Sequence, residues 1–316
     1  MKEKPNLIGL VDTSNYDTLS NAVEQVLEHI EFSFNREIKT VAIKVNLHNY
    51  WRSSSGETTD PEVVEALVDT IRLNANPDEI YLVESDATVM RTEHSFKMLG
   101  YEELAKQKNL KLVNLGKEKL IPLQPDVSVH AINPVLQKIQ VPEILTKMDL
   151  FISVPKLKIH SLTGLTCSLK NQFGCIPIKR KVMFHENLSR AIAIINKAIT
   201  PDLILVDGII SKGKTPRRLN LLMAGCNPVA VDYVAAKICG MNPKKIKHLM
   251  ESKKLGVGST NTLCVGDNWE HFAEIFPRKG FLYTKSRNAL LTLYGIYLQK
   301  ITLEGKVFGA KPAAGG

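Results

Sequence analysis

The sequence has no Cys-x-x-Cys pair, and its five cysteines are scattered from residue 167 to residue 264. Iron–sulfur clusters and zinc knuckles need cysteines at short, regular spacings, so no local ligand set for either is encoded. We therefore expect no iron–sulfur cluster. The odd number of cysteines and the lack of a signal peptide suit a reducing compartment, and we expect a cytoplasmic protein.

No stretch of the sequence approaches the roughly twenty apolar residues of a membrane-spanning helix. Aromatic residues are also few, at 6 % of the chain, and no motif that reads DNA or RNA is present. The net charge of +9 would attract nucleic acid, but the cations gather near expected strand ends rather than along one surface stripe. We therefore expect neither a spanning segment nor specific nucleic-acid binding.

Strand-like and helix-like patterns alternate along the 316 residues. This order is typical of α/β proteins, and we predict a mixed, largely parallel sheet, or sheets, flanked by helices. We expect two α/β lobes with the site between them. The N-terminal lobe comprises residues 1–145 and contains an insertion at about 110–142, and the C-terminal lobe comprises residues 146–276. Residues 277–316 are predicted to form a basic C-terminal helix and tail.

The tail contains an amphipathic pattern at residues 286–301. We favour a helix that docks on its own domain. Contact with a membrane surface or with a partner protein is the alternative. The sequence does not indicate an oligomeric state.

Two predicted strands in the N-terminal half end in polar side chains. In residues 40–46 apolar and other side chains alternate, so that Lys44 and Asn46 point to the same face. A lysine inside a strand lies at a sheet edge or faces a ligand. The next strand, residues 79–85, ends near Glu84, which is a candidate base or metal ligand. Its alternative role is an ion pair with a lysine such as Lys44.

A helix is predicted to begin between these two strands. The segment Thr58-Thr-Asp-Pro-Glu62 offers a polar N-cap, a proline in the first turn and acids near the positive end of the helix dipole. We expect Thr58 and Thr59 to serve as capping residues alone.

The central stretch joins a buried strand to a dense group of cations. The apolar residues 150–154 are followed by Lys156, Lys158 and His160 at every second position. An extended backbone would point these three side chains to one face. Lys170-Asn171 then precedes Phe-Gly and Ile-Pro, which favour a fixed turn rather than a floppy loop.

Strand ends in open α/β sheets line ligand-binding crevices, and a basic cluster there suits an anion such as a phosphate, a carboxylate or an enolate formed in a reaction. The alternative is a set of solvated surface lysines with a hydrogen-bonded loop histidine. We favour the site, with His160, Lys158 and Lys170 as catalytic candidates. The candidates for binding a ligand or cofactor are Lys44, Asn46, Lys156, Asn171 and Thr166.

Two further acids lie in the C-terminal half. Asp207 ends a predicted strand, and Asp232 lies near the start of a predicted helix. Together with Glu84 they are candidates to orient His160 or to hold a divalent ion. Asp232 could instead simply complement the helix dipole. Residues 211–218 carry four cations and no acid, which predicts a phosphate-compatible loop that lacks the spacing of a Walker loop.

Seven segments, in order, carry a resemblance that covers most of the chain: Lys44-Val-Asn46, Thr59-Asp-Pro-Glu-Val-Val-Glu-Ala-Leu-Val68, Gly100-Tyr101, Pro155-Lys-Leu-Lys-Ile-His160, Leu169-Lys-Asn-Gln-Phe-Gly174, Val206-Asp-Gly208 and Ala224-Gly-Cys-Asn-Pro-Val-Ala-Val-Asp232. These segments resemble the family catalogued as domain of unknown function 362. The resemblance implies an α/β architecture and a cytoplasmic, microbial origin.

The resemblance also has limits. Some relatives carry an added ferredoxin-like domain with clustered cysteines, which this chain does not have. The family is similar, at a distance, to nickel-dependent lactate racemases, which use lysine and histidine side chains around a nucleotide-derived cofactor, but no residue is carried over. The family usually has Glu-Gly and Gly-Pro where this chain has Ser211-Lys-Gly213 and Thr215-Pro216, so this loop lacks the acid of the family pattern and is more positive.

These patterns favour an enzyme that acts on a small anionic substrate by acid–base chemistry of lysine and histidine. Proton transfer next to a carboxylate, or transfer of an acyl or phosphoryl group, would both fit. A crowded lysine could also be neutral and nucleophilic. The alternative is a non-catalytic protein that binds a nucleotide, a cofactor or a metal and serves a redox or biosynthetic partner. A divalent metal or a nucleotide-type cofactor is compatible with either hypothesis.

Overall fold

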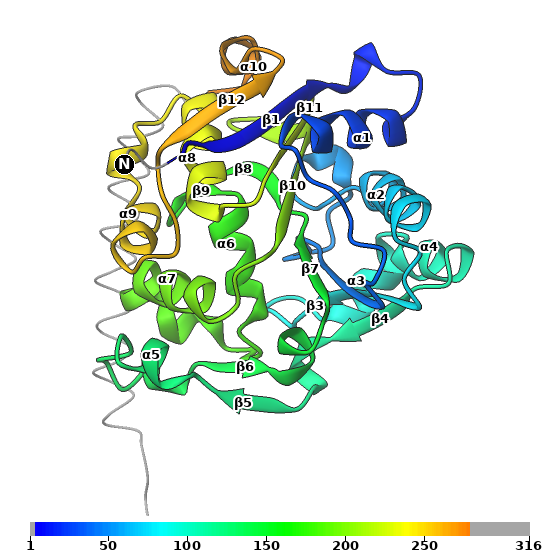
Figure 1. The fold of residues 1–316 in the computed structure, drawn as a ribbon. Coiled ribbons are helices and arrows are strands. Elements are labelled where there is room, and N and C mark those ends of the chain that lie inside the picture. The colour runs from blue at the N-terminus through cyan, green and yellow to red at the C-terminus, as the bar shows by residue number, and fades with distance from the viewer. Residues whose placement is uncertain (1–3, 279–316) are drawn as a thin grey trace, which may run out of the picture. The chain divides into compact units, whose positions relative to one another are not determined.

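Ten strands form one mixed sheet in the computed structural model, which describes residues 4–278 (Figure 1). Eight of them lie side by side in the order β12 (Thr262–Gly266), β1 (Asn6–Asp12), β11 (Pro216–Gly225), β10 (Leu203–Lys212), β7 (Leu150–Ser153), β2 (Thr40–Lys44), β3 (Glu79–Glu84) and β4 (Lys111–Asn114). The other two branch from β10, because β8 (Lys156–His160) pairs with β10 and β9 (Gly164–Thr166) pairs with β8.

Most neighbouring strands of this sheet are parallel. The antiparallel pairs in the described sheet are β1–β11, β10–β11 and β8–β9. The prediction of a mixed, largely parallel sheet flanked by helices is therefore confirmed. The predicted two-lobe arrangement is not confirmed, since β2 and β7 from the two expected halves pair directly, with Ile43 opposite Ile152. The boundary near residue 145 stays a prediction.

Alternation along the strands creates a hydrophobic core on each face of the sheet. In β10, Leu203 and Leu205 belong to one core, whereas Ile204 and Val206 belong to the other. Successive side chains of a strand point to opposite faces, so an almost continuous apolar run is what a doubly covered sheet requires.

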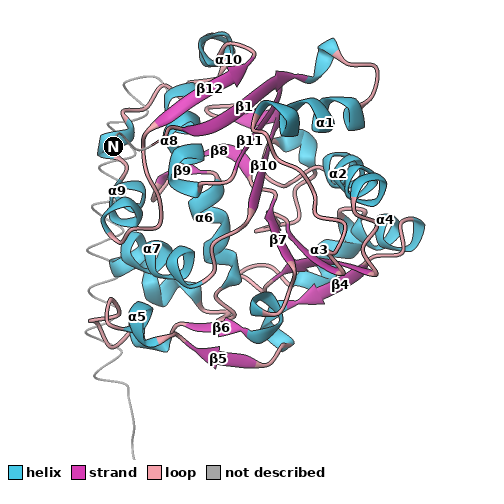
Figure 2. Ribbon diagram, in the orientation of Figure 1, coloured by secondary structure: helices cyan, strands magenta, loops and turns pink. Residues whose placement is uncertain are grey.

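Helices cover both cores (Figure 2). The first core receives side chains from α1 (Leu19–His29), α2 (Pro61–Asn74), α3 (Thr92–Met98) and α4 (Tyr101–Gln107). The second receives them from α5 (Pro125–Ser128), α6 (Ser168–Gln172), α7 (Leu188–Ala198), α8 (Pro228–Ile238), α9 (Lys247–Lys254) and α10 (Trp269–Ile275). In α7, Ile192, Ile194 and Ile195 are fully buried, and each such burial contributes about 1.5–3 kcal/mol.

The start of α2 differs in detail from the prediction. Asp60 is the N-cap, and its side chain accepts a hydrogen bond from the Glu62 amide. Thr59 does not cap: its hydroxyl donates to the Val154 carbonyl and accepts from the Asn46 amide. The expectation of a pure capping role was therefore wrong for both threonines. Thr59 links the ends of two neighbouring strand segments, and the Thr58 hydroxyl donates to the Trp51 carbonyl.

Two segments outside the predicted main strands, the expected insertion and the expected phosphate-compatible loop, contain strands. Within residues 110–142, β5 (Leu120–Pro122) and β6 (Gln140–Pro142) form a separate antiparallel pair. The expected loop at 211–218 is mostly strand, because β10 and β11 continue as a hairpin to the Lys212–Pro216 pair. Each of the two strands supplies the backbone hydrogen-bond partners of the other, and the local sequence of residues 211–218 does not indicate this pairing.

The sequence prediction at 286–301 lies outside the described residues. Within residues 4–278, no helix combines the length and the apolar character needed to cross a membrane.

Candidate functional site

The basic stretch 156–160 is a strand, as its alternating pattern predicted. Lys156 and Lys158 in β8 are almost completely buried, whereas His160 at its end is partly exposed. Because these residues alternate along one strand, they form a row from the interior of the protein to its surface.

The inner end of the row is a buried ion pair. The Lys156 ammonium lies 2.8 Å from Asp207 Oδ2, and both side chains are inaccessible to solvent. The same oxygen accepts the Asp60 amide at 2.8 Å, and Asp207 Oδ1 accepts the Ile209 amide at 3.2 Å. Both carboxylate oxygens are thus engaged within the protein, and the pair connects β8, β10 and the start of α2.

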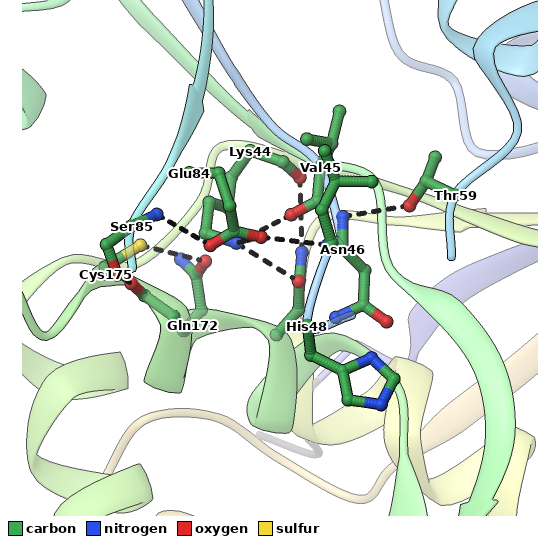
Figure 3. A network of polar contacts seen from close by, with 12 residues as sticks. Lys44, Val45, Asn46, His48, Thr59, Glu84, Ser85, Gln172 and Cys175 are labelled. Carbon is green, nitrogen blue, oxygen red and sulfur yellow. Dashed lines mark hydrogen bonds and ion pairs between the residues drawn. The ribbon is translucent and has the colours of Figure 1, made fainter. Parts of the chain in front are cut away.

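A second buried ion pair joins β2 to β3 (Figure 3). The Lys44 ammonium lies 2.8 Å from Glu84 Oε2 and donates to the Val45 carbonyl at 2.6 Å. Glu84 also accepts the amides of Leu47 and Ser85, each at 2.9 Å. This is the alternative role that the sequence left open for Glu84.

The turn after α6 fits around that pair because it contains a glycine. A Cβ atom at Gly174 would lie 2.7 Å from the Lys44 ammonium and 2.9 Å from a Glu84 oxygen. The Asn171 amide nitrogen donates to the Lys44 carbonyl at 3.2 Å and to the Ser153 hydroxyl at 3.0 Å. Asn171 and Gly174 therefore hold α6 against the ends of β2 and β7.

Lys158 occupies the middle of the row and contacts a segment that sequence reasoning did not select. Its ammonium lies 3.2 Å from Glu57 Oε2 and 3.0 Å from His48 Nδ1, and it also contacts the Glu57 carbonyl. Lys212 makes a second ion pair with Glu57. One carboxylate thus faces two cations, which leaves this part of the site with an excess of positive charge.

The pKa values in this group follow from burial and mutual repulsion. Burial lowers the pKa of Lys158 to about 8 in spite of Glu57. Burial, followed by the charge of Lys158, holds the pKa of His48 well below its usual value. Burial acts to raise the pKa of Glu57, but Lys158 and Lys212 outweigh it, so that the pKa is lowered.

The hydrogen bonds of His160 define which ring nitrogen carries its proton. Nδ1 accepts the backbone amides of Leu162 at 3.1 Å and Thr163 at 3.3 Å, which assigns the proton of the neutral ring to Nε2. Burial, followed by the charges of Lys170 and Lys158, holds the His160 pKa well below its usual value. This geometry favours a neutral ring that donates a hydrogen bond through Nε2.

Lys170 in α6 is partly buried and has an unusual environment. Its ammonium lies 4.3 Å from the centre of the Phe173 ring. Within the described residues, it makes no hydrogen bond or ion pair. Burial, followed by repulsion from Lys181, Lys158 and Lys44, lowers its pKa to about 7, although Glu84 opposes the shift.

Two candidate binding residues expose unused polar atoms to the interior. Asn46 Oδ1 and Thr166 Oγ1 are buried and have no hydrogen-bond partner in the described part of the chain. Thr166 lies directly opposite Lys158 in the β8–β9 ladder, so the two side chains share a face. Buried polar atoms are normally paired, and an unpaired one therefore calls for a ligand or a water molecule.

The three candidate metal-binding acids lie in separate places. Glu84 and Asp207 are tied to lysines, whereas Asp232 Oδ2 lies 3.8 Å from His248 Nε2 in a fully buried pair. Across residues 4–278, no three histidine, cysteine or acidic side chains are grouped to hold a metal ion. The assignment of a metal stays a prediction.

Two surface pockets, of about 360 and 380 Å³, have no residue of β8 or α6 in their linings. The first is lined by residues around the start of α2, including Arg52 and Asp60. The second is lined by α3, α4 and β4 residues, including Glu93 and Glu102. Each lining includes two or more acids and one cation, so neither resembles the cation-rich group around Lys158.

Sequence reasoning missed three polar residues of this region, namely His48, Glu57 and Lys181. Lys181 is almost fully buried; it donates to Ser85 Oγ at 2.6 Å and to two backbone carbonyls, and burial lowers its pKa to about 8. His48 carried a usable signal, since it follows the end of β2 by a few residues. Lys181 begins a 3-10 helix (Lys181–Asn187) and Glu57 lies in a loop, and neither segment has such a pattern.

Residues 41–237, more than half of the chain, match the family described as "Domain of unknown function (DUF362)". The chain belongs to this family. Every candidate site residue chosen from the sequence lies within the matched range.

A thylakoid-associated protein of Synechocystis sp. is 32 % identical over 125 residues, which cover 35 % of this chain. The match covers 39 % of that relative's length. A crystal structure of a Thermotoga maritima protein is 15 % identical, covers 75 % of this chain and 57 % of the other chain, and has a TM-score of 0.37. These matches do not show the similarity to lactate racemases.

Proposed function

We propose that this protein binds a small carboxylate or phosphate at Lys158, His160 and Lys170 and acts on it by lysine and histidine acid–base chemistry. The observation that carries the proposal is the Lys170 ammonium, which has no acceptor among the described residues while the nearby lysines do. An anion would supply the missing acceptor.

Charge favours this proposal. A buried or partly buried cation without a counterion is costly, and three neighbouring cations lower the pKa of Lys170 further. One unit of opposite charge roughly 4 Å away would contribute about 4 kcal/mol of attraction at an intermediate dielectric. The unpaired Thr166 Oγ1, opposite Lys158 in the β8–β9 ladder, offers an additional polar contact to the same ligand.

The chemistry follows from the protonation states. Lys170, with a pKa of about 7, can give or take a proton near neutral pH. His160 is suited to donate a hydrogen bond from Nε2 to an oxygen on which negative charge develops. Proton transfer next to a carboxylate and transfer of an acyl or phosphoryl group both use these two roles.

The second candidate is a non-catalytic binder of a nucleotide-type cofactor or metal that serves a partner protein, with the same lysines holding phosphates. A cytoplasmic location is part of the proposal, and the thylakoid association in the name of the Synechocystis relative is the competing location. Turnover distinguishes the two functions, because only the enzyme has turnover to lose when His160 is replaced.

The test measures sulfate binding to the full chain by isothermal titration calorimetry at pH 6.5. We expect Lys170→Met to weaken sulfate binding by about tenfold or more, and Lys179→Met, a nearby lysine outside the group, to leave it unchanged. Equal affinity of the wild type and Lys170→Met would refute the proposed anion site.

A further inference from the structure

Lys170 differs from four neighbouring lysines in the freedom of its amino group. Lys44 is held by Glu84, Lys156 by Asp207, Lys158 by Glu57, and Lys181 by Ser85. We propose that Lys170 is a nucleophile that forms an imine with the carbonyl carbon of a small 2-oxo acid. This inference rests on the proposed anion site and names the class of substrate that the site would take.

The surroundings of Lys170 suit an amine that must be neutral to react. Only the neutral amine has a lone pair for attack, and a neighbouring group of cations is an established way to produce it. Burial and the charges of Lys181 and Lys158 bring the Lys170 pKa to about 7, so that the neutral and charged forms coexist near neutral pH. The other lysines direct their ammonium protons into fixed acceptors, which prevents attack.

The groups beside Lys170 match both ends of a 2-oxo acid. The positive charge of Lys158, whose ammonium contacts Glu57 and His48, attracts the carboxylate, and the Nε2–H of His160 is suited to its carbonyl oxygen. Lys158 and His160 are two positions apart on β8, and their side chains share a face. The Phe173 ring, 4.3 Å from the Lys170 ammonium, provides an apolar surface beside the amine. A small acid with adjacent carboxylate and carbonyl groups would therefore find a partner for each.

The reaction needs no further reactant. The Lys170 nitrogen attacks the carbonyl carbon, a carbon–nitrogen bond forms, and the carbonyl electron pair moves to the oxygen. That oxygen takes up a proton, aided by the hydrogen bond from His160, and the nitrogen loses one. The hydroxyl group then leaves as water with a second nitrogen-derived proton, which yields the imine.

The test uses pyruvate as the probe and sodium cyanoborohydride to reduce the imine in the full-length protein at pH 7. Intact mass spectrometry counts the adducts, and peptide mapping locates them. We expect one reduced pyruvate adduct on Lys170, formed roughly tenfold or more faster than on any surface lysine. Sulfate should slow the trapping, because it competes for the same cations.

Two variants separate the amine from the charge. Lys170→Arg keeps the positive charge, and we expect it to bind sulfate but give no adduct, whereas Lys170→Met should lose both. A wild-type protein that binds sulfate through Lys170 but yields no adduct, or yields adducts spread over many lysines, would overturn the imine and leave the anion site standing. If, in addition, Lys170→Met bound sulfate as tightly as the wild type, both proposals would be overturned.

Discussion

Lys156 and Lys170 come from the same basic stretch, yet the fold treats them in opposite ways. Lys156 is fully buried and forms a short ion pair with Asp207, whose other contacts are backbone amides. Lys170 is more exposed and faces an aromatic ring and other cations. The comparison shows that a lysine of a basic motif can stabilise the fold when an acid lies beside it. A lysine without such an acid keeps its amino group available for a ligand.

The largest expected effect is the loss of stability when Lys156, the structural member of the two lysines, is replaced. Lys156→Met should lower the free energy of unfolding by about 3–5 kcal/mol, because Asp207 would be left buried without its counterion. Urea denaturation measures the loss. The double variant Lys156→Met/Asp207→Asn, which removes the unpaired charge but keeps an oxygen acceptor for a backbone amide, should recover part of it. A single variant as stable as the wild type would contradict the structural role.

The next effect is the pH dependence of anion binding, which tests the role of Lys170. Sulfate stays divalent between pH 6 and 9, so its affinity reports the protonation of the protein. We expect the affinity to fall as pH rises above about 7, where Lys170 loses its proton, by up to about tenfold per pH unit. In Lys170→Arg, which stays charged, the sulfate affinity should no longer fall near pH 7. A weaker fall in affinity should remain near pH 8, where Lys158, with a pKa of about 8, loses its proton. A wild-type affinity independent of pH would count against Lys170 as a ligand.

The smallest effect concerns stability. The folded-state pKa of Lys170 is lowered to about 7, whereas in the unfolded chain it is about 10.4. The unfolded state therefore binds more protons between these values, and Lys170 makes stability rise with pH across this window. Lys170→Met should be slightly more stable than the wild type below pH 7, by about 1 kcal/mol or less. Its stability should also lack the increase with pH that Lys170 causes in the wild type.

Urea titrations at pH 6, 8 and 9.5 would measure this difference. Lys179→Met serves as the control. If the wild type and Lys170→Met change in parallel with pH, Lys170 is not the group responsible.

Much of the fold could be predicted from local patterns. Apolar runs of four to six residues, separated by helical periods, predicted the parallel strands, and the alternation of Lys156, Lys158 and His160 predicted β8. The pairing partners could not be predicted. Asp207 and Glu84 were selected as metal ligands because acids at strand ends often are, but the register of the sheet places a lysine against each.

The site was predicted as a region rather than as a set of roles. His160 was expected to act as a general acid or base. Only the fold shows that two backbone amides occupy Nδ1 and that burial, followed by neighbouring cations, lowers the pKa of the ring. His48, Glu57 and Lys181 were not selected, because the loops and the short 3-10 helix that contain them have no periodic signal. Their roles arise from contacts between segments that are distant in the chain.

The sequence by itself determined the class of the fold, the course of β8 and the gathering of cations near Lys158, because hydrophobic period and charge density are local properties of a chain. Only the tertiary structure decided which lysines received an acid and which did not. Pairing depends on strand register and on the packing of α6 against the sheet, and the energy of a buried charge depends on the groups that surround it in space.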